Sequence, residues 1–139
     1  MIVGLGIDSI EIERFCNWHS KDTKTLLRLF SQDEIAYCQS NNALSAQRFA
    51  IRFAAREALF KAISLAIPSH TIPFLTLCRA ANIYKTSRGM PYLQIDWKIL
   101  KAYVNSHDAL LHNFHSTISL THTKILATAI VTLETHYLS

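Results

Sequence analysis

The fold of this chain is decided by residues 45–68, SAQRFAIRFAAREALFKAISLAIP, which carry its strongest helical pattern. Between Ala46 and Ala66 there is no Gly and no Pro, and Ala recurs, so the stretch as a whole favours a helix. We expect this helix to begin at Ser45 and to end before Pro68, which cannot continue it. A helix of this length predicts a domain whose other elements pack around it.

One flank of the predicted helix combines aromatic residues with a carboxylate. At ~100° per residue, Phe49, Phe53 and Phe60 fall within one stripe, which predicts a packed face. Glu57 lies beside that stripe, and Lys61 follows it by one turn. Two interpretations are open. The pair is either an exposed Glu–Lys contact that adds about 0.3 kcal/mol to helix stability, or a partly buried carboxylate that requires Lys61 or a metal ion.

A second flank carries a row of arginines, Arg48, Arg52 and Arg56, spaced by four residues. Such a row is common on a solvated helix face. The same spacing also suits an anion-binding site, in which guanidinium groups hold a phosphate of the ligand. Both interpretations stay open at this point.

The N-terminal segment places a second carboxylate beside an apolar strand. Residues 2–7, IVGLGI, predict a short buried strand, and Asp8 and Ser9 follow it as good N-cap residues for a helix over residues 10–18. Asp8 therefore either caps that helix or joins Glu57 in a polar site. Two carboxylates and one lysine beside apolar surface would suit a Mg²⁺ ion that holds phosphate oxygens.

The remaining pattern predicts an α+β domain. Ser31 and Glu34 form a capping box that opens a helix, and Gly89 occupies the turn position most in need of a positive φ. We expect helices over residues 20–30, 31–40 and 96–109, and strands over residues 72–85, 90–95, 117–120 and 125–133. Without a linker or repeat, residues 1–139 are expected to form one domain, with an antiparallel or mixed sheet packed on the long central helix.

Composition narrows the class of protein. The chain has 139 residues, of which 50% are hydrophobic and 17% charged, so it is long and apolar enough to bury a core. Its longest apolar stretch, residues 125–133, is too short for a membrane span, which needs roughly 18 residues. No basic segment precedes the N-terminal apolar run, so a signal peptide is not expected. Cys16, Cys38 and Cys78 are odd in number and far apart, which favours reduced thiols of a cytoplasmic protein.

The net charge of +4 permits an acidic partner without identifying one. A small nucleic-acid binder is the weakest alternative, because basic and acidic residues are mixed along the chain and no nucleic-acid motif occurs. We expect neither nucleic acid nor a membrane as a partner.

Four segments together resemble one known family. Residues 4–15 (GLGIDSIEIERF) resemble the opening motif of the holo-(acyl-carrier-protein) synthases, the small 4′-phosphopantetheinyl transferases. Residues 48–62 (RFAIRFAAREALFKA) look like the central helix of that family. Residues 118–123 (ISLTHT) are similar to its C-terminal hairpin, and residues 88–91 (RGMP) to its Gly-x-Pro turn. The resemblance runs in order over nearly the whole chain.

The resemblance implies a cytoplasmic, Mg²⁺-dependent transferase of fatty acid biosynthesis. Such an enzyme moves the 4′-phosphopantetheine arm of coenzyme A onto a serine hydroxyl of apo acyl carrier protein and releases adenosine 3′,5′-bisphosphate. Asp8 and Glu57 match the family's metal-binding carboxylates and Lys61 its phosphate-contacting lysine, so these three are the expected catalytic residues. Either Glu57 or a metal-bound water would accept the serine proton. The family typically forms homotrimers with sites between chains.

Two further groups of residues follow from the resemblance. The expected coenzyme A contacts are Arg48, Arg52, Lys61, Gly89, Pro91, His122 and Thr123, the last two on a loop that would reach the ligand from a neighbouring subunit. The expected docking residues for the acidic carrier protein are Arg14, Lys21, Lys24 and Arg28.

The chain departs from the family in two places. Arg56 stands where the family usually has Lys, which keeps the charge but changes its geometry. The Gly-rich turn that follows the family's helix is replaced by residues 63–67, ISLAI, so side chains would crowd backbone amides that approach phosphate or the pantetheine arm. The alternative function is therefore a catalytically weak or inactive homologue that binds coenzyme A or the carrier protein.

Overall fold

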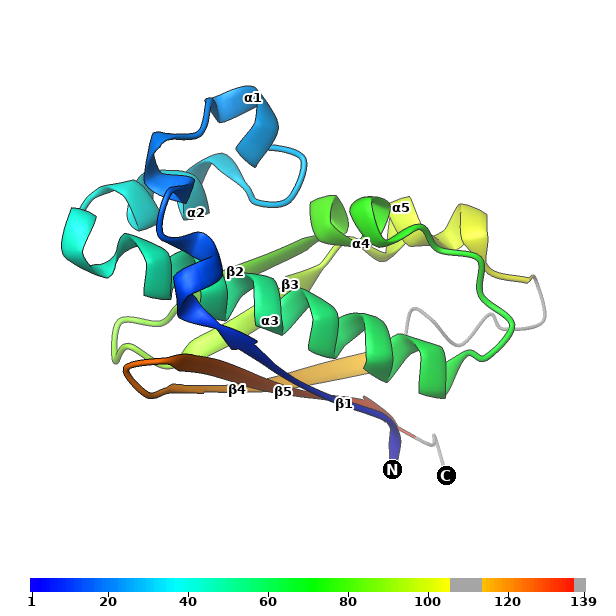
Figure 1. Cartoon of the computed structure of the whole chain (residues 1–139). Coiled ribbons are helices and arrows are strands. Elements are labelled where there is room, and N and C mark those ends of the chain that lie inside the picture. The colour runs from blue at the N-terminus through cyan, green and yellow to red at the C-terminus, as the bar shows by residue number, and fades with distance from the viewer. Residues whose placement is uncertain (106–113, 137–139) are drawn as a thin grey trace.

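A 25-residue helix, α3 (Asn42–Ala66), lies across one face of a three-stranded antiparallel sheet in the computed structural model, which describes residues 1–105 and 114–136 (Figure 1). The long helix expected from the sequence is thus confirmed. It begins earlier than expected because the side chain of Asn41 accepts a hydrogen bond from the backbone N–H of Leu44 at 3.2 Å. It ends at the expected residue.

The sheet places its middle strand beneath α3. Its order is β1–β5–β4, with β1 spanning Ile2–Glu11, β5 spanning Leu126–Thr135 and β4 spanning Phe114–His122. The strands expected at the C-terminal end of the chain are confirmed and are longer than expected. In β5, Ala127 and Ala129 are fully buried, and their small side chains allow the helix to lie close to the sheet.

The approach is tightest between α3 and β1. A Cβ atom built on Gly4 would overlap the backbone carbonyl of Ala62, and one built on Gly6 would overlap the carbonyl of Ala58. Only glycine fits these two positions while the helix stays where it is. Because strand residues alternate between faces, the side chain of Asp8 points to the same side as the two glycines.

The segment that follows β1 differs from the expectation. The strand continues through Glu11, which pairs with Leu126, so the helix expected over residues 10–18 is wrong, and so is the capping role of Asp8. Pairing with β5 overrides the local capping preference of this sequence. Two 3-10 turns come next, η1 (Ile12–Phe15) and η2 (Trp18–Ser20).

Two helices then cover the N-terminal half of α3. α1 (Thr23–Leu26) is a single turn, much shorter than the helix expected over residues 20–30. α2 (Gln32–Gln39) agrees closely with its prediction, and its capping box is present. The backbone N–H of Glu34 donates to Ser31 Oγ at 3.2 Å, and the backbone N–H of Ser31 donates to Glu34 Oε1 at 3.2 Å.

A separate hairpin, β2 (Ala81–Lys85) with β3 (Pro91–Ile95), lies beside the sheet. Gly89 in its turn has a φ of 78°, as predicted. The strand expected over residues 72–85 is only half right, because α4 (Phe74–Ala80) precedes β2. This short apolar run packs against α3, α5 and β2, and periodicity alone does not separate a buried strand from a buried helix.

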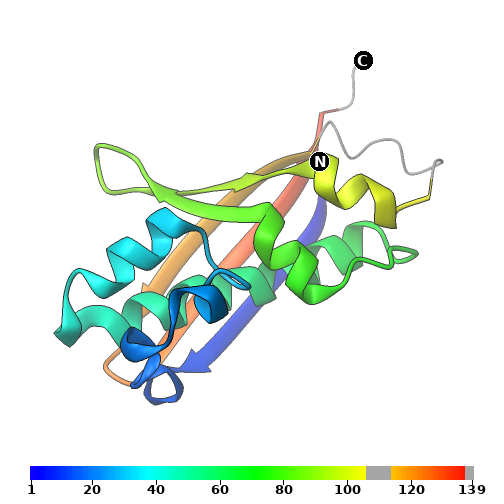
Figure 2. The same ribbon diagram turned by 90° about the horizontal axis from the view of Figure 1, so that it is seen from above.

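The predicted start of the helix over residues 96–109 is confirmed. Asp96 caps α5 (Trp97–Leu100) by accepting a hydrogen bond from the backbone N–H of Lys98 at 3.1 Å. A 3-10 turn, η3 (Lys101–Tyr103), follows, and residues 106–109 lie outside the described part of the chain. Seen from above, α1 and α2 lie over one end of α3, and α4 and α5 over the other (Figure 2).

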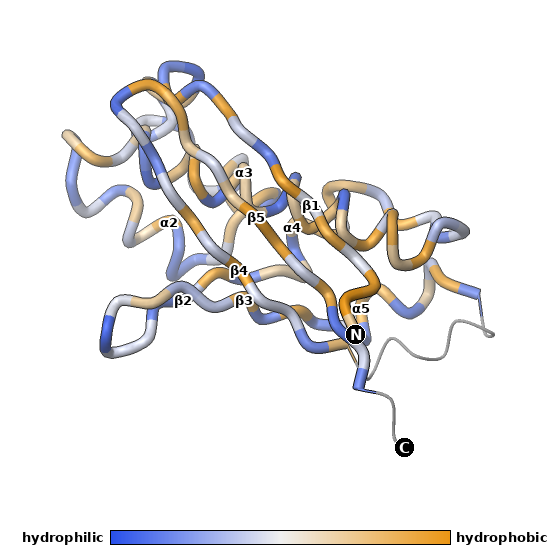
Figure 3. Tube along the Cα trace, turned by 90° about the horizontal axis from the view of Figure 1, so that it is seen from below, coloured by the Kyte–Doolittle hydropathy of each residue, from blue (hydrophilic) through white to orange (hydrophobic). Residues whose placement is uncertain are grey.

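The helices of the described chain all lie on one side of the sheet, so its other face is uncovered (Figures 1 and 3). Leu5, Ile7 and Ile130 lie on that face and are 49%, 56% and 38% exposed. Three aliphatic side chains on neighbouring strands form an apolar patch of the kind that a partner usually covers.

All three cysteines are free thiols, as predicted, with Cys38 and Cys78 buried and Cys16 exposed. Burial raises the pKa of Cys38 to about 11 and that of Cys78 to about 12, so both are unreactive at neutral pH. Within the described residues, no helix has the length and apolar character needed to cross a bilayer.

The contact between β1 and α3 gives a test of the fold. Gly6→Ala should lower the free energy of unfolding by about 3 kcal/mol, because the added methyl group would force the helix off the sheet. Gly89→Ala is the matched control: no atom lies within 4 Å of a Cβ built there, so only its positive φ opposes the change, at a cost of about 1 kcal/mol. Urea unfolding measures both, and equal losses would contradict the packing described here.

Candidate functional site

Asp8 lies inside β1, where it pairs with Ala129 of β5, and not after the end of a strand. Its carboxylate meets Lys61 of α3, whose Nζ is 3.1 Å from Asp8 Oδ1 and donates to the backbone carbonyl of Ile7 at 2.8 Å. The Lys61 side chain is 52% exposed and that of Asp8 18%. Such a contact adds little to stability, which leaves both charges available to a ligand.

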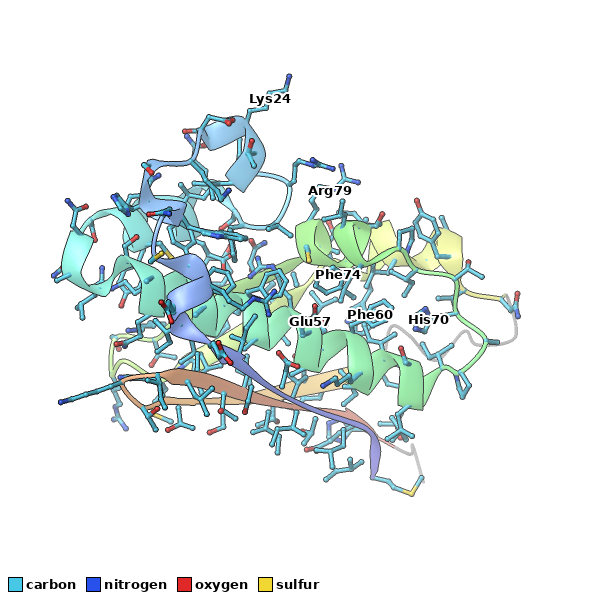
Figure 4. The ribbon with its side chains drawn as sticks, in the orientation of Figure 1. Lys24, Glu57, Phe60, His70, Phe74 and Arg79 are labelled. Atoms are coloured by element: carbon cyan, nitrogen blue, oxygen red, sulfur yellow. The ribbon has the colours of Figure 1, made fainter. Side chains whose placement is uncertain are left out.

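Glu57 is half-buried on the same flank of α3, one helical turn from both Phe53 and Phe60. Figure 4 shows it beside Phe60. Burial raises the pKa of Glu57 above its ordinary value, and the negative charge of Asp8 raises it further, while the positive charge of Lys61 opposes both. Glu57 is therefore partly buried, as in the second interpretation, and the cation that it would hold stays a prediction. Two carboxylates that repel each other in a partly buried place form a site that favours a cation.

On another flank of α3 a cavity gathers most of the predicted coenzyme A contacts. Its volume is about 360 Å³, within the range of small-molecule sites. Its lining includes Arg48, Arg52, Gly89, Pro91 and His122. α3, the β2–β3 hairpin and β4 thus each contribute to one cavity, although they are far apart in sequence.

Neither of the two arginines in this cavity lies on a solvated helix face, so that interpretation is wrong for them. Arg52 is only 5% exposed, and its Nη1 donates to the backbone carbonyl of Arg48 at 3.3 Å. Its Nε lies 3.6 Å from Glu34 Oε2 and has no hydrogen-bond partner among the described residues. Arg48 Nη1 donates to the carbonyl of Tyr37 at 2.7 Å and to Ser40 Oγ at 3.0 Å.

The third arginine of the row has a different role. Arg56 is fully buried, and its Nη1 and Nη2 donate to the two carboxylate oxygens of Glu34 at 3.0 and 2.6 Å. Its Nε donates to the carbonyl of Cys78 at 3.1 Å, and Nη2 also to that of Ala81 at 2.7 Å. Arg56 thus joins α2, α4 and β2 to α3, and the anion-binding interpretation is wrong for it. A lysine could not make this forked set of bonds.

The turn between β4 and β5 carries the two predicted loop residues. Gln47 Nε2 lies 3.4 Å from His122 Nδ1, which places the ring at the end of the cavity. Thr123 Oγ1 accepts hydrogen bonds from the backbone N–H groups of Ile125 and Leu126 at 3.2 and 3.0 Å. Thr123 therefore shapes the turn and does not line the cavity.

The two groups of predicted site residues lie on opposite flanks of α3. Arg52 and Lys61 are nine residues apart, which places them ~180° apart around the helix and ~13 Å apart along it. Across the sheet, Asp8 is on the edge strand β1 and His122 on the other edge strand β4, with β5 between them. One chain therefore does not bring the carboxylates and the cationic cavity to the same ligand phosphates.

The predicted docking residues all lie in the segment from η1 to the residues after α1. Arg14, Lys21, Lys24 and Arg28 are each exposed. Lys24 reaches away from the sheet, and Arg79 of α4, which the sequence did not single out, points to the same side (Figure 4). The positive charge of Arg14 also acts to lower the pKa of Glu57, so this one member of the group lies near the carboxylates.

The sequence did not indicate three polar residues of the cavity, Tyr37, Gln47 and Lys85. Gln47 lies one turn before Ile51, which also lines the cavity, so helical spacing could have indicated it. Tyr37 and Lys85 come from α2 and β2, and only the tertiary structure brings them together.

The turn without glycine continues α3 to Ala66 and fixes the segment that follows. Ser64 Oγ donates to the carbonyl of Phe60 at 2.8 Å and lies 2.9 Å from His70 Nε2. The backbone N–H of Ile72 donates to His70 Nδ1 at 3.1 Å. Side-chain hydrogen bonds thus hold the chain at the place where the resemblance led us to expect a Gly-rich turn.

Comparison with known proteins shows the family of the chain. The sequence profile of the 4′-phosphopantetheinyl transferase superfamily matches residues 4–128. The chain is 33% identical over 134 residues to a holo-[acyl-carrier-protein] synthase of Treponema denticola, and the alignment covers 96% of this chain and 99% of the relative. It is also 33% identical to the holo-[acyl-carrier-protein] synthase of Geobacter sulfurreducens, with 96% and 98% covered.

Solved structures show the same fold. The holo-(acyl-carrier-protein) synthase of Bacillus anthracis in complex with CoA (3′,5′-ADP) superposes with a TM-score of 0.69 and 27% identity, covering 98% of this chain and 99% of that one. The ACPS–CoA complex of "Chronobacterium ammoniagenes" gives a TM-score of 0.73 and 25% identity, with 96% and 97% covered.

The different contributions of Arg52 and Arg56 to the fold can be measured as losses in the free energy of unfolding. Arg56→Met should lower the free energy of unfolding by about 4 kcal/mol, because it leaves the buried Glu34 carboxylate without its main partner. Arg52→Met is the matched control and should cost about 1 kcal/mol, since it removes one longer contact and one hydrogen bond. Urea unfolding of both variants tests the assignment, and an equal loss for Arg52→Met would refute it.

Proposed function

The chain belongs to the 4′-phosphopantetheinyl transferase superfamily, and we propose that it acts as a holo-(acyl-carrier-protein) synthase. It transfers the 4′-phosphopantetheine arm of coenzyme A to a serine of apo acyl carrier protein, in support of fatty acid biosynthesis. The observation that carries this proposal is the group formed by Asp8, Glu57 and Lys61 on one flank of a helix whose other flank lines a cationic cavity of about 360 Å³.

Asp8 and Glu57 fit the donors that Mg²⁺ prefers, one or two carboxylates completed by phosphate oxygens and water. Their mutual repulsion, which contributes to the raised pKa of Glu57, would be relieved by a cation between them. Among the described residues no group of three or more His, Cys, Asp or Glu side chains could hold a metal ion alone, so the proposed ion shares its coordination with the substrate. When bound, it withdraws negative charge from the pyrophosphate.

The side chains around the carboxylates position the reacting groups. Lys61 provides a further positive charge for the pyrophosphate, and Arg52 and Arg48 hold the ribose phosphate of the nucleotide. A bond forms between the serine oxygen and the phosphorus that bears the pantetheine, while the bridging P–O bond breaks and the serine proton leaves to a base. The leaving group is adenosine 3′,5′-bisphosphate. Positioning and electrostatic stabilisation supply most of the rate increase.

We further propose that the active enzyme is a homotrimer that builds each site from two subunits. The support is geometric: the carboxylates and the cavity lie on opposite flanks of α3, so a neighbouring chain must supply one of them. The uncovered sheet face with Leu5, Ile7 and Ile130 offers an apolar surface for such an assembly. His122 and Thr123 would then approach the ligand that is bound to the carboxylates of the next subunit.

The exposed basic segment suits an acidic carrier protein. Arg14, Lys21, Lys24 and Arg28 are exposed positive charges of the N-terminal segment, and Arg14 lowers the pKa of Glu57. Together they would steer an acidic partner toward the site. The free cysteines fit the proposed cytoplasmic location.

A mass assay tests the reaction directly. Incubation with coenzyme A, Mg²⁺ and apo acyl carrier protein should add one phosphopantetheine mass to the carrier. Glu57→Gln should lower the turnover by at least ~100-fold, because it removes a charged metal ligand. Mass spectrometry of the carrier measures both results.

Glu13→Gln, at an exposed glutamate of η1, is the matched control and should retain turnover. No mass gain with the unaltered protein under any divalent metal would refute the transferase. Binding of coenzyme A without turnover, measured by calorimetry, would then favour the inactive homologue instead.

Assembly is tested separately. Ile7→Glu places a charge in the uncovered apolar face and should convert the trimer to monomers, since like charges would meet in the interface. Ile99→Glu is the control, because Ile99 is 41% exposed on α5, away from that face. Light scattering coupled to gel filtration measures the mass, and a monomeric unaltered protein would contradict the proposed assembly.

A further inference from the structure

Tyr37 of α2 is the common contact of three cationic side chains. The guanidinium carbon of Arg48 lies 4.1 Å from the centroid of its ring, and that of Arg52 lies 4.6 Å from it. Lys85 Nζ lies 5.0 Å from the same centroid and donates a hydrogen bond to the Tyr37 hydroxyl at 2.8 Å. All four residues line the cavity of about 360 Å³.

The positive charge of this group is only partly compensated. Among the described residues, Glu34 is the only carboxylate in an ion pair with one of these cations, and both Glu34 oxygens already accept hydrogen bonds from Arg56. Arg52 Nε is left with a 3.6 Å contact to Glu34 and no hydrogen bond within the described residues. A buried guanidinium with an unused donor beside an open cavity is a costly arrangement unless an anion completes it.

An aromatic ring can hold several cations together without neutralising their charge, which a carboxylate cannot do. The face of the ring attracts cations through its quadrupole, so it holds like charges near one another. A carboxylate would also gather them, but it would neutralise their charge and compete with an incoming anion. The ring therefore keeps three cations together and leaves their charge free for a phosphate.

We propose that Tyr37 is a positioning residue that gathers Arg48, Arg52 and Lys85 into one receptor for the 3′-phosphate of the nucleotide. Tyr37 itself does not need to touch the phosphate. It sets how strongly the enzyme prefers coenzyme A to the same molecule without the 3′-phosphate. This inference rests on the proposed function, because it assigns the cavity to the nucleotide part of coenzyme A.

The experiment compares coenzyme A with dephospho-coenzyme A as donors for apo acyl carrier protein. Tyr37→Leu keeps an apolar side chain but removes the ring, so it should raise the KM for coenzyme A about ten-fold. It should leave kcat, and the KM for dephospho-coenzyme A, unchanged within about two-fold. Tyr37→Phe keeps the ring face and should restore most of the preference.

Two more variants make the comparison specific. Lys85→Met changes an exposed side chain that the fold does not need, and should raise the KM for coenzyme A about three-fold with no effect on dephospho-coenzyme A. Tyr92→Leu removes an exposed tyrosine of β3 that stacks on Tyr84 outside the cavity, and should change neither KM.

The results of these assays distinguish a failure of the role assigned to Tyr37 from a failure of the proposed transferase activity. An equal rise in both KM values for Tyr37→Leu, or no rise in either, would overturn the role of Tyr37 while leaving the transferase intact. If the unaltered protein transfers nothing, the proposed function fails, and calorimetry still decides on Tyr37. Tyr37→Leu should then weaken binding of adenosine 3′,5′-bisphosphate but not of adenosine 5′-monophosphate, and equal binding by the variant and the unaltered protein would overturn the inference.

Discussion

The close approach of α3 to β1 is the constraint on which the rest of the molecule depends. Gly4 and Gly6 have no side chain to hold the helix away. The carbonyl groups of Ala62 and Ala58 therefore occupy the space that a Cβ atom on either residue would need. A helix at this distance brings Lys61 within 3.1 Å of Asp8 and places Glu57 close enough to Asp8 for their charges to interact. With a larger residue at either position the helix would move outward, and the two carboxylates would separate. The glycines therefore serve the site as much as the fold.

The same helix separates the carboxylates from the cationic cavity. α3 lies across β1 and β5, with the carboxylates beside β1 and the cationic cavity on the flank toward β4 and the β2–β3 hairpin. Between these flanks, Arg56 crosses the core to Glu34 and to the carbonyls of Cys78 and Ala81, and so fixes α2 and α4 against the helix. The division explains why a small domain with a complete core would still require a second copy of itself to complete the proposed site.

Sequence reasoning succeeded where the deciding forces are local. The long helix, the capping box at Ser31, the positive φ of Gly89 and the C-terminal hairpin each follow from neighbouring residues. It failed where distant partners decide: pairing with β5 extends β1 past Asp8, and α4 forms within an apolar run whose burial hides its period. Steps of four residues rotate by ~40° each, which carries Arg56 into the core while Arg48 lines the cavity. That rotation was available from the sequence. The gathering of Tyr37 with Lys85 was not, since they lie on separate elements.

The central claim is that carboxylates of one subunit and the cationic cavity of another form each active site. Co-expression of Glu57→Gln, which should lack turnover, with Arg52→Met, which should bind coenzyme A weakly, tests it most directly when transfer is measured at a coenzyme A concentration far below the KM of Arg52→Met. In mixed trimers, one interface in about four joins an intact carboxylate half to an intact cavity half, so the mixture should regain about a quarter of the unaltered activity. A mixture no more active than the two variants measured separately would place both halves of the site in one chain and contradict the account.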